Sequence, residues 1–570
     1  MEIYEEILLK NNTEVLEYWL ELCSSCKKTQ EDVLLGIINS SKDTLFGEEH
    51  NFSNINSIDD FRKEVPISDY EDIEKYIDKM ADGKKDILFP GLTNFFISTS
   101  GTTGKSKIIP ESVESNHAKS AVLKLRNAFL YKLFNENIVN LERFAEFIKF
   151  KNYDIKSMNA QDIVNDVYFY SVTSASPNKK TSGGIDIGFA SGKTFDNSKY
   201  ADRLGYPKEI MGLDDGEAIM YLTMLFALCH DDIVFITSNN AGRFYTRIKY
   251  AQNHAEDLIR DLKNGTISKE INLSNDERKF FESLISPNPK RAKELEELLN
   301  KGREYFIPKY YWKYLFVGRF WLSGSVGVNV DKVRPYLPDD ILYVDIGYGA
   351  SEGKFNIPSK NDSGQGILAI GSLFYEFIPI DNPEVILTAD ELECGEEYEI
   401  ILTTYSGLYR YPLHDIIKVR GFFENTPIIE FISKSKEIIN IAQEKLPAPQ
   451  IIDLLKEHII SLGFNLRQGQ IYPNNKTLSY EIYIELEEDD HEINWDAFAF
   501  DFDELLREKF ELYDRNRKFG SLNQLKTHVM KQGWQNYLYN MKEATGAPKS
   551  QVKLESMIKE APSEEWIFVD

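Results

Sequence analysis

The sequence predicts an α/β protein made of two domains of unequal size. The chain has 570 residues, which is more than a single hydrophobic core usually spans. From Tyr314 onward, short β-branched strands alternate with helical segments, as they do around an α/β sheet. A charged run at 434–437 and the proline pair at 447–449 then separate this region from a smaller α+β pattern. We therefore place one domain at residues 1–432 and a second at residues 433–570.

Composition limits the class of protein. The chain is 42% hydrophobic and 13% aromatic, enough for packed cores, and its four cysteines exclude a disulfide framework. Its net charge of −25 disfavours nucleic acid and anionic membranes as partners. The N-terminus is too acidic for a secretory signal, and the longest apolar run, Ala218 to Cys229, is about half a membrane span. We expect a cytoplasmic monomer that binds neither nucleic acid nor a membrane.

The elements follow from periodicity and capping. Ser68 and Glu71 form a capping-box pattern that predicts the start of a helix with an apolar face. An apolar helix is expected at 217–229 and another helix at 289–301. Strands are expected at 233–236, 341–346, 366–378 and 398–404. The second domain is predicted to contain helices at 451–462, 495–512 and 533–543, with strands at 478–486 and 524–530.

A dense run of hydroxyl side chains and glycines follows the apolar strand end Phe95–Ile97. Five hydroxyl side chains and two glycines occur within the seven residues 98–104, and Lys105 and Lys107 come next. Such a turn can direct backbone N–H groups, hydroxyls and ammonium charge at a polyphosphate. The alternative is a polar surface loop, but ordinary loops rarely combine these residue types so densely behind a buried strand. We favour a nucleotide-phosphate loop.

A Walker A loop is the rival nucleotide interpretation, because Gly104-Lys105-Ser106 resembles its end. That motif needs a glycine five residues before Gly104, and position 99 is threonine. A Walker A loop also opens a helix, whereas residues 107–110 are β-prone and end in proline. The sequence therefore disfavours a kinase-like phosphate loop.

Two later turns carry carboxylates that suit the same ligand. The predicted strand at 341–346 runs into a small-residue turn that ends at Glu352, a suitable place for a metal–phosphate group. Asp415 precedes a β-branched run, where its carboxylate could accept hydrogen bonds from ribose hydroxyls. Taken alone, either residue could be an ordinary turn acid. Together with the loop at 98–107, they favour a nucleotide site.

Three motifs in order carry a family resemblance. They are Ser-Thr-Ser-Gly-Thr-Thr-Gly at 98–104, Tyr-Gly-Ala-Ser-Glu at 348–352 and Tyr-Arg-Tyr-Pro-Leu-His-Asp at 409–415. Supporting stretches stand at 65–72 and 546–553. The chain resembles the acyl acid amido synthetases, the auxin-responsive family of the adenylate-forming superfamily to which firefly luciferase belongs. The resemblance extends over nearly the whole chain.

The resemblance implies an α/β fold with a large N-terminal adenylation domain, in which helices flank β-sheets, and a small mobile C-terminal α+β domain. It also implies a reaction in two steps. A carboxylic acid first attacks the α-phosphate of Mg-ATP and forms an acyl-adenylate and pyrophosphate. An amine, typically an amino acid, then attacks the activated carbonyl and releases AMP. ATP and Mg²⁺ are the expected cofactors, and a carboxylic acid and an amine are the expected substrates.

Roles for individual residues also come from the resemblance. Those expected at the phosphates are Ser98, Thr99, Ser100, Thr102, Thr103 and, as a catalytic group, Lys107. Those expected around the nucleoside are Ser323, Gly324, Tyr348 (near adenine), Gly349, Ala350, Ser351 and Asp415 (at the ribose). Glu352 would bind Mg²⁺, Lys434 or Lys436 would mark the hinge, and Lys553 would approach the α-phosphate as a catalytic lysine. For Lys553, a plain surface lysine is the alternative.

Some positions depart from the family pattern. Pro412 and His414 replace an expected arginine and glycine, and Ala118 and Lys119 stand where plant members place an arginine for the acyl carboxylate. The acidic composition, rich in Asn, Lys and Ile, indicates a bacterial source, which argues against a plant-hormone substrate. Two other functions stay open: acyl transfer to a thiol of coenzyme A or a carrier protein, and nucleotide binding without catalysis.

Overall fold

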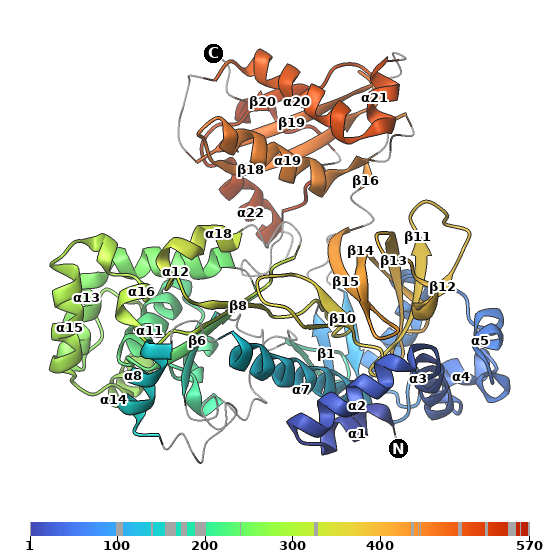
Figure 1. The fold of residues 1–570 in the computed structure, drawn as a ribbon, viewed down its shortest axis with the longest axis horizontal. Helices are drawn as coiled ribbons and strands as arrows, with labels where there is room; N and C mark the ends of the chain where they lie inside the picture. Colours follow the sequence, from blue (N-terminus) through green and yellow to red (C-terminus); the bar gives the residue numbers. More distant parts are fainter. Residues whose placement is uncertain are drawn as a thin grey trace. The chain divides into compact units, whose positions relative to one another are not determined.

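The computed structural model describes most of the chain in two compact units. The described residues are 2–98, 107–137, 141–153, 167–172, 179–188, 201–239, 241–323, 329–434, 438–439, 441–442, 444, 446–487, 493–518, 522–544, 554–558 and 560–567. The first unit comprises Met1–Ser98, Ile108–Pro412 and Lys418–Phe431, and the second comprises Thr99–Lys107, Leu413–Ile417 and Ile432–Asp570 (Figure 1). Leu413–Ile417, which lie inside the predicted domain at 1–432, therefore group with the second unit.

Short helices form the N-terminal part of the first unit. They are α1 (Ile3–Leu9), α2 (Asn12–Ser24), α3 (Cys26–Ser41), α4 (Leu45–Glu49), α5 (Ile58–Glu64) and α6 (Tyr70–Ala81). The predicted cap of α6 was wrong by one residue, because the capping box is made by Asp69 and Asp72. The backbone N–H of Ser68 instead donates to the carbonyl of Arg410 at 3.3 Å, which keeps Ser68 outside the helix.

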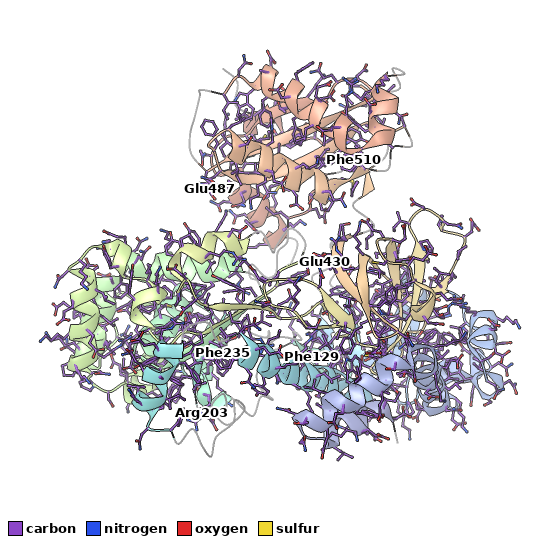
Figure 2. The ribbon with its side chains drawn as sticks, in the orientation of Figure 1. Phe129, Arg203, Phe235, Glu430, Glu487 and Phe510 are labelled. Atoms are coloured by element: carbon purple, nitrogen blue, oxygen red, sulfur yellow. The ribbon has the colours of Figure 1, made fainter. Side chains whose placement is uncertain are left out.

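A parallel four-stranded sheet forms one layer of the first unit. Its strand order is β3 (Tyr168–Val172), β6 (Ile233–Ser238), β7 (Val317–Phe320) and β8 (Leu342–Asp345), which confirms the strands predicted at 233–236 and 341–346. The neighbouring strands β3 and β6 contact each other through Phe169 and Phe235, whose stacked rings have centroids 4.8 Å apart. Phe235 is labelled in Figure 2. The accompanying helices are α8 (Leu141–Lys151), α11 (Gly216–Leu228), α12 (Ala241–Asn253), α13 (Ala255–Asn264), α14 (Asn275–Leu284), α15 (Pro289–Leu299), α16 (Pro308–Tyr311) and α18 (Asn329–Val333).

A second sheet brings together the two ends of the predicted phosphate loop. Its order is β2 (Ile108–Glu111), β1 (Phe95–Ser98), β5 (Asp186–Gly188) and β4 (Lys179–Lys180). β1 and β2 are antiparallel, and Ser98 pairs with Ile108 in their register. The long helix α7 (Val113–Glu136) follows β2, and the hydroxyl of Ser112 caps it by accepting from the N–H of Ser115. The intervening residues 99–106 lie outside the described residues.

The third sheet has seven strands. Their order is β12 (Leu387–Thr388), β11 (Phe374–Pro379), β13 (Glu397–Thr403), β14 (Tyr411–Phe423), β15 (Thr426–Lys434), β10 (Gly366–Leu368) and β9 (Asn356–Pro358). The strand predicted at 398–404 is confirmed. The strand predicted at 366–378 is two strands, because the backbone turns at 369–372, where the N–H of Ser372 donates to the carbonyl of Ala369 at 3.2 Å.

A buried ion-pair network ties this sheet to α5. The carboxylate of Glu376, only 1% exposed, accepts from Arg410 Nε at 2.8 Å and from Arg62 Nε at 2.8 Å. Arg410 also donates to the carbonyl of Val65 at 2.9 Å. Both carboxylate oxygens and both Nε donors are thereby paired, as a buried charge pair requires, while Arg62 Nη2 is buried without a partner among the described residues.

The second unit is the predicted small α+β structure. Its sheet has the order β18 (Leu466–Asn474), β19 (Ser479–Leu486), β20 (Lys526–Val529), and its helices are α19 (Ala448–Ser461), α20 (Trp495–Lys509), α21 (Glu511–Lys518) and α22 (Trp534–Ala544). A two-stranded piece pairs β16 (Ile438–Ile439) with β17 (Leu446–Pro447). The helix predicted at 495–512 divides at Phe510, and β18 was not predicted. Among the described residues, no helix is long and apolar enough to cross a membrane.

Arg410→Met tests the buried network. The substitution leaves the Glu376 carboxylate buried with Arg62 alone, so we expect the free energy of unfolding to fall by about 3–5 kcal/mol. Urea unfolding followed by tryptophan fluorescence measures this. The control is Arg420→Met, which removes a half-exposed pair with Glu430 and should cost less than about 1 kcal/mol. Equal losses in the two variants would contradict the assignment.

Candidate functional site

The turn after β8 is built on a buried carboxylate. Asp345, the last residue of β8, accepts hydrogen bonds from the N–H of Leu322 at 2.6 Å and from the N–H of Gly347. Burial raises the pKa of Asp345 to about 6, although these two bonds and the positive charges of Arg126 and Arg319 oppose the shift. The carboxylate therefore joins the ends of β7 and β8 at the carboxyl edge of the parallel sheet.

Arg126 on α7 holds the turn from the other side. Its guanidinium donates to three backbone carbonyls: Tyr348 at 2.7 Å, Asn356 at 2.9 Å and Ile346 at 3.0 Å. Gly347 has φ +88°, and a Cβ at this position would overlap the guanidinium. A glycine is therefore required here both by backbone conformation and by space.

The predicted metal ligand lies at the end of this turn. Glu352 is 9% exposed, and its negative charge adds to burial in raising the pKa of the Tyr411 phenol. Beside it, Lys119 on α7 donates to the carbonyl of Ser351 at 3.0 Å and forms an ion pair with Glu111 at 2.6 Å. Tyr411 and Glu352 are therefore close enough to interact, although they lie far apart in the sequence.

Lys354 is a site residue that sequence reasoning missed. The side chain of Lys354 packs against Gly349 of the second motif. A Cβ added at Gly349 would lie 2.9 Å from Lys354 Cδ. Burial and the charges of Arg126 and Lys119 lower the pKa of Lys354 to about 7, against the opposing charge of Glu111. Its signal was its place two residues after Glu352. Arg126 could have been found as the one arginine between the apolar positions Val122, Leu125 and Phe129 of its helix.

Glu352 suits a Mg²⁺ ion that is shared with substrate phosphates better than it suits a metal ion bound by protein side chains alone. The described part of the chain contains no group of three or more His, Cys, Asp or Glu side chains arranged to hold a metal ion. Mg²⁺ is commonly held by one or two carboxylates together with substrate phosphates and water. Glu352, a buried carboxylate at the end of the turn after β8, fits that donor set.

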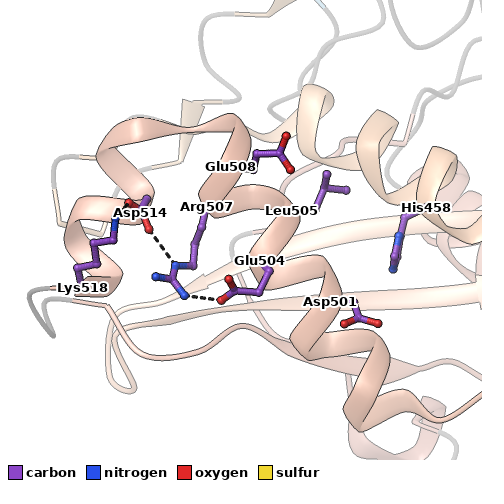
Figure 3. Close-up of a pocket in the computed structure, with 8 residues that line it drawn as sticks. All are labelled: His458, Asp501, Glu504, Leu505, Arg507, Glu508, Asp514 and Lys518. Atoms are coloured by element: carbon purple, nitrogen blue, oxygen red, sulfur yellow. Dashed lines mark hydrogen bonds and ion pairs between the residues drawn. The ribbon is translucent and has the colours of Figure 1, made fainter.

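A hollow in the second unit contains none of the predicted residues. It has a volume of about 620 Å³ and is lined by His458, Asp501, Glu504, Leu505, Arg507, Glu508, Asp514 and Lys518 (Figure 3). Its charges pair with one another, since Arg507 binds Glu504 and also Asp514 at 3.0 Å, and Lys518 also binds Asp514. A surface network of this kind needs no ligand, so we do not place the active site here.

Family models identify the chain. The model of the GH3 family N-terminal domain matches residues 15–171 and 153–342, that of the central domain matches 366–434, and that of the C-terminal domain matches 467–562. The chain belongs to the GH3 family. The acyl acid amido synthetase resemblance inferred from the three motifs is thereby confirmed, together with membership of the adenylate-forming superfamily.

Curated and solved relatives agree. The chain is 24% identical over 525 residues to indole-3-acetic acid-amido synthetase GH3.6 of Arabidopsis thaliana, covering 85% of this chain and 81% of that protein. It is 23% identical over 570 residues to the 4-substituted benzoates-glutamate ligase GH3.12 of the same plant, covering 95% and 94%. The solved structure of GH3.15 acyl acid amido synthetase superposes with a TM-score of 0.78 at 21% identity, covering 97% and 96%. This likeness confirms the predicted fold class.

Some of the remaining predicted site residues lie in or next to strands, some make side-chain contacts, and the others lie outside the described residues. Ser98 ends β1, Lys107 precedes β2, Lys434 ends β15, and Asp415 lies buried inside β14 rather than in front of a strand. The hydroxyl of Ser323 donates to the carbonyl of Gly364 at 2.9 Å, and the Tyr348 ring packs against Phe355 at 4.8 Å and Phe431 at 5.3 Å. Outside the described residues lie Thr99, Ser100, Thr102, Thr103, Gly324, Lys436 and Lys553.

Gly347→Ala tests the construction of the turn. The added methyl group would displace the Arg126 guanidinium and impose a strained positive φ, so we expect a loss of about 2–4 kcal/mol in stability. Thermal unfolding of the variant, with and without Mg-ATP, measures this together with any loss of nucleotide binding. Gly212→Ala is the control, because a Cβ added at Gly212 would meet no atom within 4 Å and its φ is ordinary. A Gly347→Ala protein as stable as this control would refute the packing.

Proposed function

We propose that this protein is an ATP-dependent acyl-acid amido synthetase. It activates a carboxylic acid as an acyl-adenylate with release of pyrophosphate. It then transfers the acyl group to an amine, which we propose is that of an amino acid. The observation that carries the proposal is the turn at 346–352, where a buried carboxylate, Glu352, ends a structure that Asp345 and Arg126 both hold in place. Membership of the GH3 family supports the same activity.

The first half-reaction needs compensation of phosphate charge. A carboxylate is a poor electrophile, and linkage to AMP gives it a good leaving group. Mg²⁺ bound by Glu352 and phosphate oxygens would offset the charge that develops during attack on the α-phosphate. We assign the phosphates to the hydroxyls of residues 98–103 and to Lys107, the ribose to Asp415, and the approach to the α-phosphate to Lys553. Residues 323–324 and 348–351 would surround the rest of AMP.

The second half-reaction needs an amine at the activated carbonyl. We favour an amine over a thiol because the quoted relatives are named as amide-forming synthetases and ligases that act with indole-3-acetic acid or with benzoates and glutamate. We propose that the domain at 433–570 moves between the two steps about Lys434 or Lys436. We further propose a bacterial, cytoplasmic, monomeric enzyme that binds no nucleic acid or membrane. Its composition supports a bacterial source, whereas the quoted relatives are from plants.

Pyrophosphate release tests the activity. With Mg-ATP and a panel of carboxylic acids, we expect release that depends on the acid, and amide and AMP when amino acids are added. Glu352→Ala should lower the rate by at least about 10²–10³-fold, because it removes a group that stabilises developing charge. The control is Glu384→Ala, which removes an exposed carboxylate and should leave the rate unchanged.

The results that would contradict the proposed activity can be told apart from one another. Release without amide but with a thioester from coenzyme A would assign the thiol function instead. No release with any acid of a broad panel would favour nucleotide binding without catalysis. Near-normal turnover of Glu352→Ala would remove Glu352 as the metal ligand while leaving the activity in place.

A further inference from the structure

Two arginines lie one turn apart on α12. This helix begins three residues after the last residue of β6, Ser238, and so it starts at the carboxyl edge of the parallel sheet (Figure 1). Arg243 and Arg247 are four residues apart and therefore share one face of α12. Both are partly buried, although a helix on the surface of an acidic protein could keep such side chains in water.

Tyrosine hydroxyls lie beside this pair. Burial lowers the pKa of Arg243, the charge of Arg247 adds to this, and the phenol of Tyr206 opposes it. The charge of Arg247 also acts on the phenols of Tyr170 and Tyr206, so its guanidinium lies near both hydroxyls. Tyr206 is itself anchored, because its hydroxyl donates to the carbonyl of Ser171 at 2.5 Å. The two guanidiniums thus repel each other in a rigid aromatic setting.

Arg247 is incompletely satisfied. Within the described residues its Nη1 is buried and has no hydrogen-bond partner, and no carboxylate forms an ion pair with the side chain. Leaving a buried donor of a charged group unpaired costs about 1–3 kcal/mol or more. Arg410 and Arg126 are fully engaged, whereas Arg62 Nη2 and Arg319 Nε are, like Arg247 Nη1, buried donors without a partner among the described residues. Arg247 differs from these two in having a second arginine, Arg243, on the same helix face. An unsatisfied guanidinium in this setting is typical of a site that awaits an anionic ligand.

The pair belongs to the same sheet edge as the Glu352 turn. Phe244, next to Arg243, packs its ring 6.2 Å from that of Phe320, the last residue of β7. Two residues later, the N–H of Leu322 binds Asp345, from which the turn to Glu352 starts. Ligands of open α/β sheets bind at the carboxyl ends of the strands. A substrate whose reacting end lies at the Glu352 turn can therefore extend along this edge toward α12.

We propose that Arg243 and Arg247 bind a second carboxylate, at the far end of the acyl acid, so that the substrate is a dicarboxylic acid. The planar guanidinium fork suits a carboxylate, and a pair of them can hold both oxygens. The reacting carboxylate enters the adenylation step and the distal one stays bound to α12. This inference rests on the proposed amido synthetase function for its activity readout, but not for its binding readout.

The test compares matched acids. Dicarboxylates, among them glutarate, adipate and terephthalate, are compared with pentanoate, hexanoate and benzoate in pyrophosphate release and in calorimetric binding. The wild-type protein should prefer the dicarboxylate of at least one pair by 10-fold or more. Arg247→Gln should weaken dicarboxylate binding on the order of 10- to 100-fold, the range expected for a hydrogen bond to a charged group, without weakening monocarboxylate binding.

Controls separate this role from a structural one. Lys249→Gln removes a nearby cation of α12 that contacts the rings of Tyr245 and Tyr336, and it should leave the preference unchanged. If Arg247→Gln does not fold, Arg247→Lys keeps the charge and should lose part of the preference. A wild-type preference for monocarboxylates, or an equal preference in wild type and Arg247→Gln, would overturn the inference and leave the amido synthetase activity intact. If no acid is activated, calorimetric dicarboxylate binding that Arg247→Gln abolishes still supports the site, and no binding refutes it.

Discussion

The guanidinium of Arg126 is the contact on which the candidate site depends. It reaches from α7 to three carbonyls of the segment 346–356, and it occupies the space that a side chain on Gly347 would need. Because its partners are backbone atoms, the turn is held in one conformation whatever its side chains do. Glu352 and Lys354 thereby receive fixed positions at the end of the parallel sheet. Catalytic groups gain most from such rigid support, since a misplacement of about 1 Å is costly.

The first two residues of the third family motif, Tyr409 and Arg410, stabilise the fold. Tyr409 donates from its hydroxyl to the carbonyl of Leu88 at 2.6 Å, and Arg410 is committed to Glu376. Tyr411 is the first residue of the motif whose surroundings include Glu352. Beyond it, His414 adopts φ +57° inside β14, a conformation that only a minority of non-glycine residues take. Where the family pattern has glycine at this position, the conformation would be unstrained, so the departure noted in the sequence has a local cost.

Sequence reasoning predicted the elements that have a strong pattern. Alternation at Ser479–Leu486 predicted β19, and the small-residue turn after an apolar strand predicted the place of Glu352. It missed β18, because the segment from Leu466 to Asn474 mixes Gly469 and polar side chains without a clear period. The role of Arg126 in holding the turn after β8 could not be predicted either, because it binds carbonyls more than 200 residues away in the sequence. Pairings of this kind arise from tertiary structure and leave no local signal.

Transfer of labelled oxygen tests the central claim most directly. An acid that supports pyrophosphate release is prepared with ¹⁸O in both carboxylate oxygens and is incubated with Mg-ATP and an amino acid. If the carboxylate attacks the α-phosphate and the amine then expels AMP, mass spectrometry will find one ¹⁸O in AMP and the other in the amide. Unlabelled AMP, or label in phosphate or pyrophosphate, would contradict activation through an acyl-adenylate.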